Sequence, residues 1–274
     1  MRFAITGCDR YLTIFQEFLR AGWTPVKLFS APPINDFSTN RRMTQLAEQH
    51  GCPVQLTRMH DQDLRNLAEL NCDALIVASY DWRIGDWRPY LRYAINFHPS
   101  PLPVGRGGYP LPRAILEKRK SWAMTCHKVE AEFDCGDILA SEQFALHEFE
   151  THESLNLKLQ IAGRSLARRL ATRLEEYWDA AVPQNGGEYW PKVENDDRTL
   201  NFQASVDTIL RTTRAFGNLG CYAKFDSGLL GVVNVQGWQQ KHDVEPGEIV
   251  HVNDQHIVVA ARDGYVALLG INRG

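Results

Sequence analysis

The sequence predicts an α/β protein with a Rossmann-like, doubly wound and mostly parallel sheet, followed by a small β-rich domain. Strand-like and helix-like stretches alternate through roughly the first 80 residues, as in a parallel sheet covered by helices. The run ALIVAS at 74–79 is apolar up to its final serine, which is typical of a central strand buried on both faces. About five short strand-like runs with glycine-containing turns fill the last 60 or so residues and predict the second domain.

The N-terminal elements follow from the spacing of apolar residues. Tyr11, Ile14, Phe15 and Phe18 recur at helical spacing and predict a helix. Runs of apolar residues between polar or glycine-containing breaks predict the strands. We expect strands at 2–7, 25–29, 53–56 and 74–79, and helices at 10–21, 41–51 and 61–70.

A long amphipathic helix is predicted at 151–177, with Thr151 as its N-cap. One stripe of this helix is apolar and is expected to face the core: Leu155, Leu159, Ala162, Leu166, Leu170 and Leu174. Arginines occupy the other side, and such a run of charge is typical of a solvated helix face: Arg164, Arg168, Arg169 and Arg173.

The composition changes over 178–201, which is polar and rich in Gly, Pro and Asn and therefore reads as a linker. We divide the chain into a domain at 1–180, a linker at 181–202 and a C-terminal β-barrel-like domain at 203–274. In the last part we expect a helix at 203–215 and strands near 221–225, 230–238, 247–252, 256–261 and 265–271.

The totals exclude several classes of protein. A net charge of −3 and a pI of about 6.3 provide no general attraction to nucleic acid. The first strand leads into TGCDR, which matches neither a dinucleotide fingerprint nor a P-loop. The six cysteines form no CxxC pair, so we expect neither a metal site nor a disulfide framework. The start lacks a signal-peptide core and no apolar run could span a membrane, so a cytoplasmic location is expected.

The stretch 94–113, AINFHPSPLPVGRGGYPLPR, holds the first candidate site residues. Asn96 and His98 lie two residues apart at the end of a short strand, so their side chains should project from one face. Prolines then forbid helix, and glycines allow a tight turn around Arg106. An amide beside an imidazole at a strand end is a catalytic arrangement, whereas the alternative is a proline-rich loop with incidental polar residues.

A second stretch, 121–140, reads as strand, tight turn and strand. His127 lies on one face of the first strand, and Asp134 lies in the turn DCGD. An Asp that polarises a His, next to an Asn, would form an acid–base site.

Together these motifs resemble the formyltransferases that use 10-formyltetrahydrofolate. The motifs are Asn-x-His-x-Ser-x-Leu-Pro, Arg-Gly, Thr-x-His and Asp-x-Gly-Asp-Ile, in that order. The family includes enzymes that act on methionyl-tRNA, glycinamide ribonucleotide, nucleotide-linked sugars and hydroxyornithine. The resemblance implies the formyltransferase fold with an OB-like C-terminal domain, and catalytic roles for Asn96, His98 and Asp134.

The resemblance also implies binding residues. Those expected to bind the folate are Trp82, Arg83, Ile84, Ser100, Asp134, Cys135, Gly136 and Asp137. Those expected to bind the acceptor are Arg106, Gly107, Tyr109 and His127. The co-substrate would be 10-formyltetrahydrofolate, and no metal is implied.

The implied chemistry is attack of a neutral amine on the formyl carbon. Asn96 and a protonated His98 would donate hydrogen bonds to the tetrahedral oxyanion, and Asp134 would raise the pKa of the imidazole.

The acceptor is expected to be a small amine, because the loop at 31–40 is short and only Arg41 and Arg42 follow it. A nucleotide-linked amino sugar is the first expectation, a hydroxyornithine-type amine the second, and methionyl-tRNA the third. A non-catalytic folate-binding or OB-type binding module is the alternative of another class, and the existence of a homodimer stays open.

Overall fold

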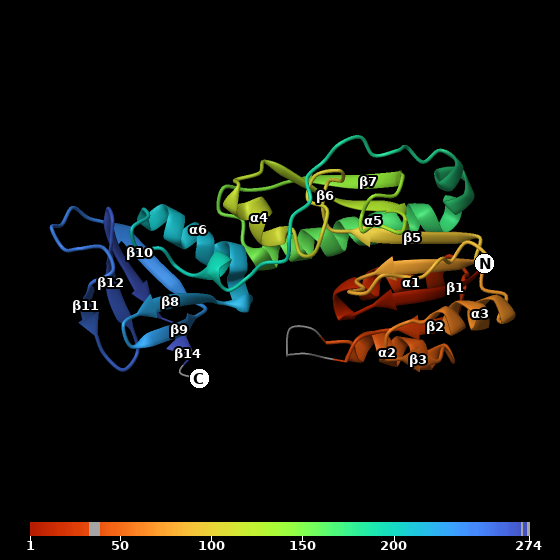
Figure 1. The fold of residues 1–274 in the computed structure, drawn as a ribbon, viewed down its shortest axis with the longest axis horizontal. Helices are drawn as coiled ribbons and strands as arrows, with labels where there is room; N and C mark the ends of the chain where they lie inside the picture. The colour runs from red at the N-terminus through yellow and green to blue at the C-terminus, as the bar shows by residue number, and fades with distance from the viewer. Residues whose placement is uncertain (33–38, 270, 273–274) are drawn as a thin grey trace. The chain divides into compact units, whose positions relative to one another are not determined.

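The computed structural model describes residues 1–32, 39–269 and 271–272, and the chain divides into two compact units. The first unit comprises 1–108, 122–144 and 158–190, and the second comprises 109–121, 145–157 and 191–274 (Figure 1). The domain boundaries inferred from composition stay a prediction. Part of the predicted 31–40 loop, residues 33–38, lies outside the described residues. No helix in the described ranges is long and apolar enough to cross a membrane.

A seven-stranded sheet carries the first unit, in the order β3-β2-β1-β4-β5-β6-β7. Neighbouring strands from β3 through β5 pair in parallel, whereas β6 runs antiparallel to β5. This mostly parallel sheet confirms the predicted fold class. Its strands are β1 (Arg2–Gly7), β2 (Thr24–Phe29), β3 (Val54–Gln55), β4 (Ala74–Ala78), β5 (Tyr93–His98), β6 (Ser121–Lys128) and β7 (Ile138–Ala145).

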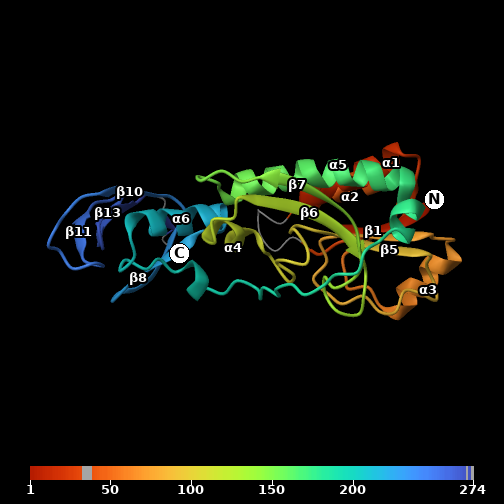
Figure 2. The same cartoon turned by 90° about the horizontal axis from the view of Figure 1, so that it is seen from above.

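Helices cover both faces of this sheet. They are α1 (Leu12–Arg20), α2 (Arg41–Gln49), α3 (Asp61–Glu69) and α5 (His152–Asp179). Figure 2 shows α1, α2 and α5 over one face and α3 over the other. All six residues of the predicted apolar stripe of α5 are buried. The arginines of the opposite side are exposed, and Arg164 and Arg169 pair with Glu17 and Glu142 at 2.8 and 2.6 Å.

The packing of the core determines which way the site residues of β5 point. Phe97 packs edge-on against Phe18 of α1, with ring centroids 6.4 Å apart, so it faces the layer of α1 and α5. Because successive side chains of a strand alternate, Asn96 and His98 project toward the other face, where α3 lies. Ala94, two residues before Asn96, belongs to the core cluster that also contains Leu64 of α3.

The second unit consists of α4 (Leu111–Leu116), α6 (Val206–Phe216) and two antiparallel sheets. The sheet orders are β10-β13-β12-β11 and β14-β9-β8. The strands are β8 (Cys221–Phe225), β9 (Gly228–Val232), β10 (Val235–Gln239), β11 (Ile249–Val252), β12 (Ile257–Ala261), β13 (Gly264–Leu268) and β14 (Ile271–Asn272). The single strands predicted at 230–238 and 265–271 are therefore wrong, since each stretch contributes to two different sheets. The predicted β-rich C-terminal part is confirmed, whereas α4 had not been predicted.

Candidate active site

The candidate active site begins at the carboxyl end of β5. The antiparallel register places Asn96 opposite His127 of β6, and His98 opposite Thr125. Residues that lie directly opposite each other on paired strands share a face. The register therefore brings two imidazoles and one amide to the same side of the sheet. The spacing of Asn96 and His98 had predicted this for the amide and one of the imidazoles.

Asp134 completes this cluster from the turn between β6 and β7. Its backbone is left-handed (φ 56°), a conformation that Asp tolerates better than most residues. Its Oδ2 atom accepts a hydrogen bond from the backbone N–H of Gly107 at 2.9 Å. Its Oδ1 atom lies 3.3 Å from His98 Nδ1 and 3.5 Å from His127 Nε2. Gly136 is required in the same turn, because a Cβ atom there would collide with the carbonyl oxygen of Lys128.

The ring of His98 is fixed at both nitrogens. Its Nε2 atom lies 2.8 Å from the carbonyl oxygen of Gly105, which can only accept, so Nε2 carries a proton. The other nitrogen, Nδ1, faces the carboxylate of Asp134. His98 and Asp134 are only 5 % and 8 % exposed, so this pair is shielded from bulk water. A proton taken up at Nδ1 would be held directly by Asp134.

His127 and Asn96 form the second half of the cluster. His127 Nδ1 lies 2.7 Å from the backbone carbonyl oxygen of Lys128 and donates to it, so Nε2 of the neutral ring is an acceptor. Asn96 Nδ2 donates to this Nε2 atom at 3.0 Å and to Asp134 Oδ1 at 3.2 Å. Both amide hydrogens of Asn96 are therefore engaged, and one must change partner before Asn96 can donate to an oxyanion.

Burial lowers the pKa of His98, whereas the sequence had led us to expect a raised pKa. Desolvation lowers the pKa of His98 from 6.5 and outweighs the opposing effects of the Asp134 carboxylate and the Gly105 carbonyl. Asp134 does act to raise the pKa of His98, as expected, but burial outweighs it and the net shift is downward. Desolvation raises the pKa of Asp134, but His98 and His127 outweigh it and the net shift is downward.

The residues expected to bind folate lie in two neighbouring loops. The guanidinium carbon of Arg83 lies 5.6 Å from the ring centroid of Phe133, so the 82–84 loop and the Asp134 turn meet there. The rings of Trp82 and Tyr80 pack edge to face with their centroids 5.2 Å apart, and Ile84 packs against the core cluster. Asp137 pairs with Lys128 at 3.2 Å. Ser100 is fully buried and donates to the Val104 carbonyl at 2.8 Å, which places it beneath the proline-rich loop.

The residues expected to bind the acceptor are more dispersed. Gly107 and His127 belong to the Asp134 cluster. Arg106 donates through Nη1 to the sulfur of Cys135 at 3.3 Å, and its Nε atom is buried without a hydrogen-bond partner among the described residues. Tyr109 lies in the second unit, where its hydroxyl group bonds His152. The structure therefore brings Arg106, Gly107 and His127 together at Asp134, whereas the Tyr109 hydroxyl bonds His152 within the second unit.

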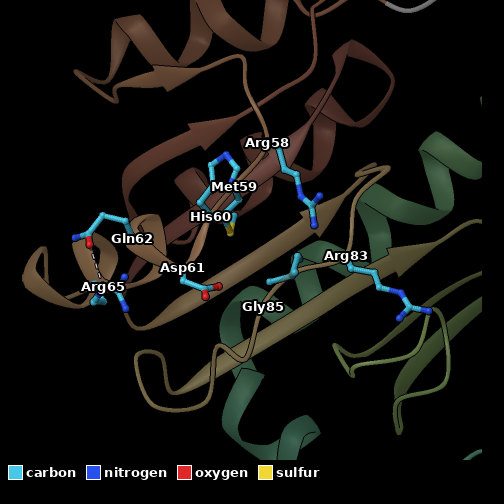
Figure 3. A pocket seen from close by; sticks show the side chains of 9 residues that line it. Arg58, Met59, His60, Asp61, Gln62, Arg65, Arg83 and Gly85 are labelled. Carbon is cyan, nitrogen blue, oxygen red and sulfur yellow. Dashed lines mark hydrogen bonds between the residues drawn. The ribbon is translucent and has the colours of Figure 1, made fainter.

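A pocket of about 460 Å³ next to the 82–84 loop was not predicted from the sequence. Figure 3 shows its lining, which comes from the segment 58–65 and from Arg83, Ile84 and Gly85. Three of the nine lining residues are arginines (Arg58, Arg65 and Arg83) and one is an aspartate (Asp61). The pocket therefore carries excess positive charge. Among the described residues, neither Arg58 nor Arg83 has an ion-pair partner. The sequence did not predict this pocket, because its arginines are spread over 25 positions of the chain.

The cluster comprises a buried carboxylate, two imidazoles and a carboxamide at the carboxyl end of a strand in an α/β sheet, and its imidazoles can take up and release protons. Within the described ranges, no group of three or more His, Cys, Asp or Glu side chains could hold a metal ion.

Two family models match the chain. The model described as formyl transferase matches residues 27–169, and the model described as formyl transferase, C-terminal domain, matches residues 192–274. The chain belongs to the formyl transferase family and is a formyltransferase, which confirms the predicted family and class of enzyme. A methionyl-tRNA formyltransferase from Rickettsia bellii is 27 % identical over 222 residues, which cover 78 % of this chain and 72 % of that protein.

Solved structures share the fold at lower identity. HypX from Aquifex aeolicus in complex with tetrahydrofolic acid matches with a TM-score of 0.67 and 22 % identity, over 98 % of this chain. The chain spans only 43 % of HypX. An N-formyltransferase from Helicobacter canadensis, in complex with folinic acid and dTDP-3-aminofucose, matches with a TM-score of 0.71 and 12 % identity over 99 % of both chains.

Proposed function

We propose that the chain transfers the formyl group of 10-formyltetrahydrofolate to the amine of a small acceptor, a nucleotide-linked amino sugar. The observation that carries the proposal is the cluster of Asn96, His98 and Asp134, in which a buried carboxylate lies 3.3 Å from one imidazole and 3.2 Å from the amide nitrogen. Such a cluster suits acyl transfer, which needs oxyanion donors and a proton acceptor.

Two features support folate as the formyl donor. Tetrahydrofolic acid is bound in the HypX structure and folinic acid in the Helicobacter canadensis enzyme. The 82–84 loop and the Asp134 turn meet at Arg83 and Phe133, so residues of both loops lie close enough together to contact one bound pterin ring. The arginine-rich pocket beside Arg83 would then receive the carboxylates of the folate glutamate, since guanidinium groups bind carboxylates in a planar, two-point geometry.

In the proposed mechanism the acceptor amine attacks the formyl carbon, and the bond from that carbon to the folate nitrogen then breaks. The amine loses a proton, and the folate nitrogen gains one. His98 Nδ1 is the basic nitrogen of the ring, because Nε2 donates to Gly105, and Asp134 would stabilise the imidazolium that forms. Asn96 would donate to the oxyanion after giving up one of its two present acceptors.

The choice of a small acceptor rests on charge. Binding of RNA depends on phosphate contacts from Lys and Arg, whereas this chain has a net charge of −3. The Helicobacter canadensis enzyme, which matches over nearly the whole chain, was crystallised with a nucleotide-linked amino sugar.

A second candidate acceptor is methionyl-tRNA, because curated relatives such as that of Rickettsia bellii are named methionyl-tRNA formyltransferases. This candidate predicts steeply salt-dependent binding, since each neutralised phosphate releases counterions. The two candidates therefore differ in the effect of ionic strength as well as in the product.

The test is a panel of acceptors incubated with 10-formyltetrahydrofolate, with products followed by mass spectrometry. The panel contains nucleotide-linked 3-amino and 4-amino sugars, hydroxyornithine and charged initiator tRNA, each at low and moderate salt. We expect addition of a formyl group to an amino sugar, with little effect of salt. Formylation of the tRNA alone, abolished by moderate salt, would replace the sugar with the second candidate.

A further inference from the structure

The segment 182–190, which follows α5, packs across both loops of the candidate active site. Val182 pairs with Ile138 through two backbone hydrogen bonds of 2.8 and 2.9 Å. Toward the other end of the segment, Arg106 N–H donates to the carbonyl of Glu188 at 3.0 Å and Trp190 N–H donates to the carbonyl of Arg106 at 2.6 Å. The segment therefore joins the Asp134 turn to the loop that carries Gly105 and Gly107.

Buried aromatic packing secures the end of this segment. Trp190 is 2 % exposed and stacks on Trp122 of β6, with ring centroids 5.7 Å apart and planes inclined by 20°. Gly107 has φ 103°, and a Cβ atom there would collide with the carbonyl oxygen of Trp190. The close approach of Trp190 to this loop explains why glycine is needed beside Arg106.

Gln184 lies in the middle of the segment and binds the Asp134 turn directly. Its Nε2 atom donates to the carbonyl oxygens of Asp134 at 2.9 Å and Gly136 at 2.8 Å. The orientation of this amide is determined by chemistry, because the reversed group would place its oxygen against two carbonyl oxygens. Both amide hydrogens are thus used to hold the turn that presents the Asp134 carboxylate.

The remaining atom of this amide, Gln184 Oε1, is buried and has no hydrogen-bond partner among the described residues. Burial of an unpaired carbonyl is costly, and such atoms are rare in folded proteins. Within the described residues four buried side-chain atoms lack partners, and two of them, Gln184 Oε1 and Arg106 Nε, border the Asp134 turn. An unpaired acceptor at this position suits a ligand that brings an N–H group.

We propose that Gln184 is a folate-binding residue: its Oε1 atom accepts a hydrogen bond from an N–H group of the bound pterin while its amide nitrogen holds the Asp134 turn. The inference rests on the folate dependence proposed above. A reduced pterin carries several N–H donors, including its exocyclic amino group, and binding would pair an acceptor that is otherwise unsatisfied. Gln184 was absent from the sequence-based set because its surroundings resemble a linker in composition.

The test compares Gln184→Met with Asn185→Leu, a change at the exposed neighbouring position. The methionine has about the same length but removes both the donor and the acceptor. Affinity for 5-formyltetrahydrofolate, a stable isomer of the formyl donor, is measured by titration calorimetry, and thermal unfolding is recorded on the same samples without ligand. We expect Gln184→Met to weaken folate binding by about 5- to 150-fold, the range for one buried hydrogen bond. Asn185→Leu should bind as the wild type does.

Two results would overturn the inference. A Gln184→Met protein that binds 5-formyltetrahydrofolate as tightly as the wild type would show that Gln184 is not a folate ligand, even if its turnover or melting temperature falls. A wild-type protein that binds no folate would overturn both this inference and the proposed function, so the two failures are distinguishable.

Discussion

Replacement of Asp134 by Asn tests the candidate active site most directly, because it keeps the shape of the side chain and removes its charge. The carboxylate receives the Gly107 N–H on Oδ2 and the Asn96 amide on Oδ1. An asparagine has one acceptor oxygen and one NH2 group, so it can satisfy only one of these two donors. If its oxygen stays on Gly107, its NH2 group faces Asn96 Nδ2 and also donates to His98 Nδ1.

The expected loss of turnover follows from the hydrogen bond that the new NH2 group donates to His98 Nδ1. A donor facing His98 Nδ1 keeps this nitrogen unprotonated, so the ring can no longer accept a proton there. The same Asp-to-Asn change in a Ser-His-Asp triad lowers turnover about 10⁴-fold by imposing the wrong tautomer, and we expect a loss of about 10³- to 10⁴-fold here. The Asn96 amide N–H loses its acceptor in this variant. A buried donor without a partner should lower the free energy of unfolding by about 1–3 kcal/mol.

The assay is formyl transfer to the amine identified in the acceptor panel, with turnover expressed per folded molecule and unfolding followed in denaturant. Glu132→Gln is the matched control, because it removes an exposed carboxylate from the same turn. Glu132→Gln should leave turnover and stability nearly unchanged. Near-wild-type turnover in folded Asp134→Asn protein would refute the assignment of Asp134 as the partner of His98.

Four further outcomes are expected. Asn96→Ala should lower turnover about 10²- to 10³-fold. The double variant with His98→Ala should lose far less turnover than the product of the two single fold losses, because both residues act on one transition state. A double loss equal to that product would contradict this. Because burial lowers the pKa of His98 below 6.5, the unfolded chain binds a proton that the folded chain does not, so the free energy of unfolding should fall as the pH drops below 6.5. His98→Gln should reduce that slope in denaturant titrations, and an unchanged slope would count against a neutral buried ring. Arg58→Ala should raise the KM for 10-formyltetrahydrofolate with little change in kcat; a change in kcat alone would argue against a glutamate pocket. Limited proteolysis should cut within 191–200 before 182–190, because the latter is hydrogen-bonded to both loops of the candidate active site.

Local patterns predicted the parts of the fold that depend on one segment at a time. The apolar stripe of α5 was visible because every buried position recurs at the helical period. The shared direction of Asn96 and His98 followed from the alternation of a strand. The division of 230–238 between two sheets could not be predicted, since β9 pairs with β8 and β14 whereas β10 pairs with β13, and these partners are set by tertiary structure.

The parts of the site that escaped prediction depend on contacts between distant residues. The direction of the His98 pKa shift depends on how deeply the ring is buried, and the sequence shows only that a carboxylate lies nearby. Gln184 lies 50 positions from the residue whose carbonyl it binds. The arginine pocket likewise combines α3 with the loop after β4. Composition alone made 182–190 resemble a linker, because its hydrogen bonds go to partners far away in the chain.

The stacked pair of Trp122 and Trp190 gives the protein an intrinsic optical signal. The ring centroids of the two indoles lie 5.7 Å apart and their planes are inclined by 20°, so their electronic transitions couple, and a twist between the two transition moments gives a paired positive and negative band in circular dichroism. One indole belongs to β6 and the other to the segment that crosses the site, so the paired band should exist only while that segment is docked. Subtracting the spectrum of Trp122→Phe would isolate the band from the other tryptophans. Detachment of the segment during a reaction cycle could then be timed without any added dye.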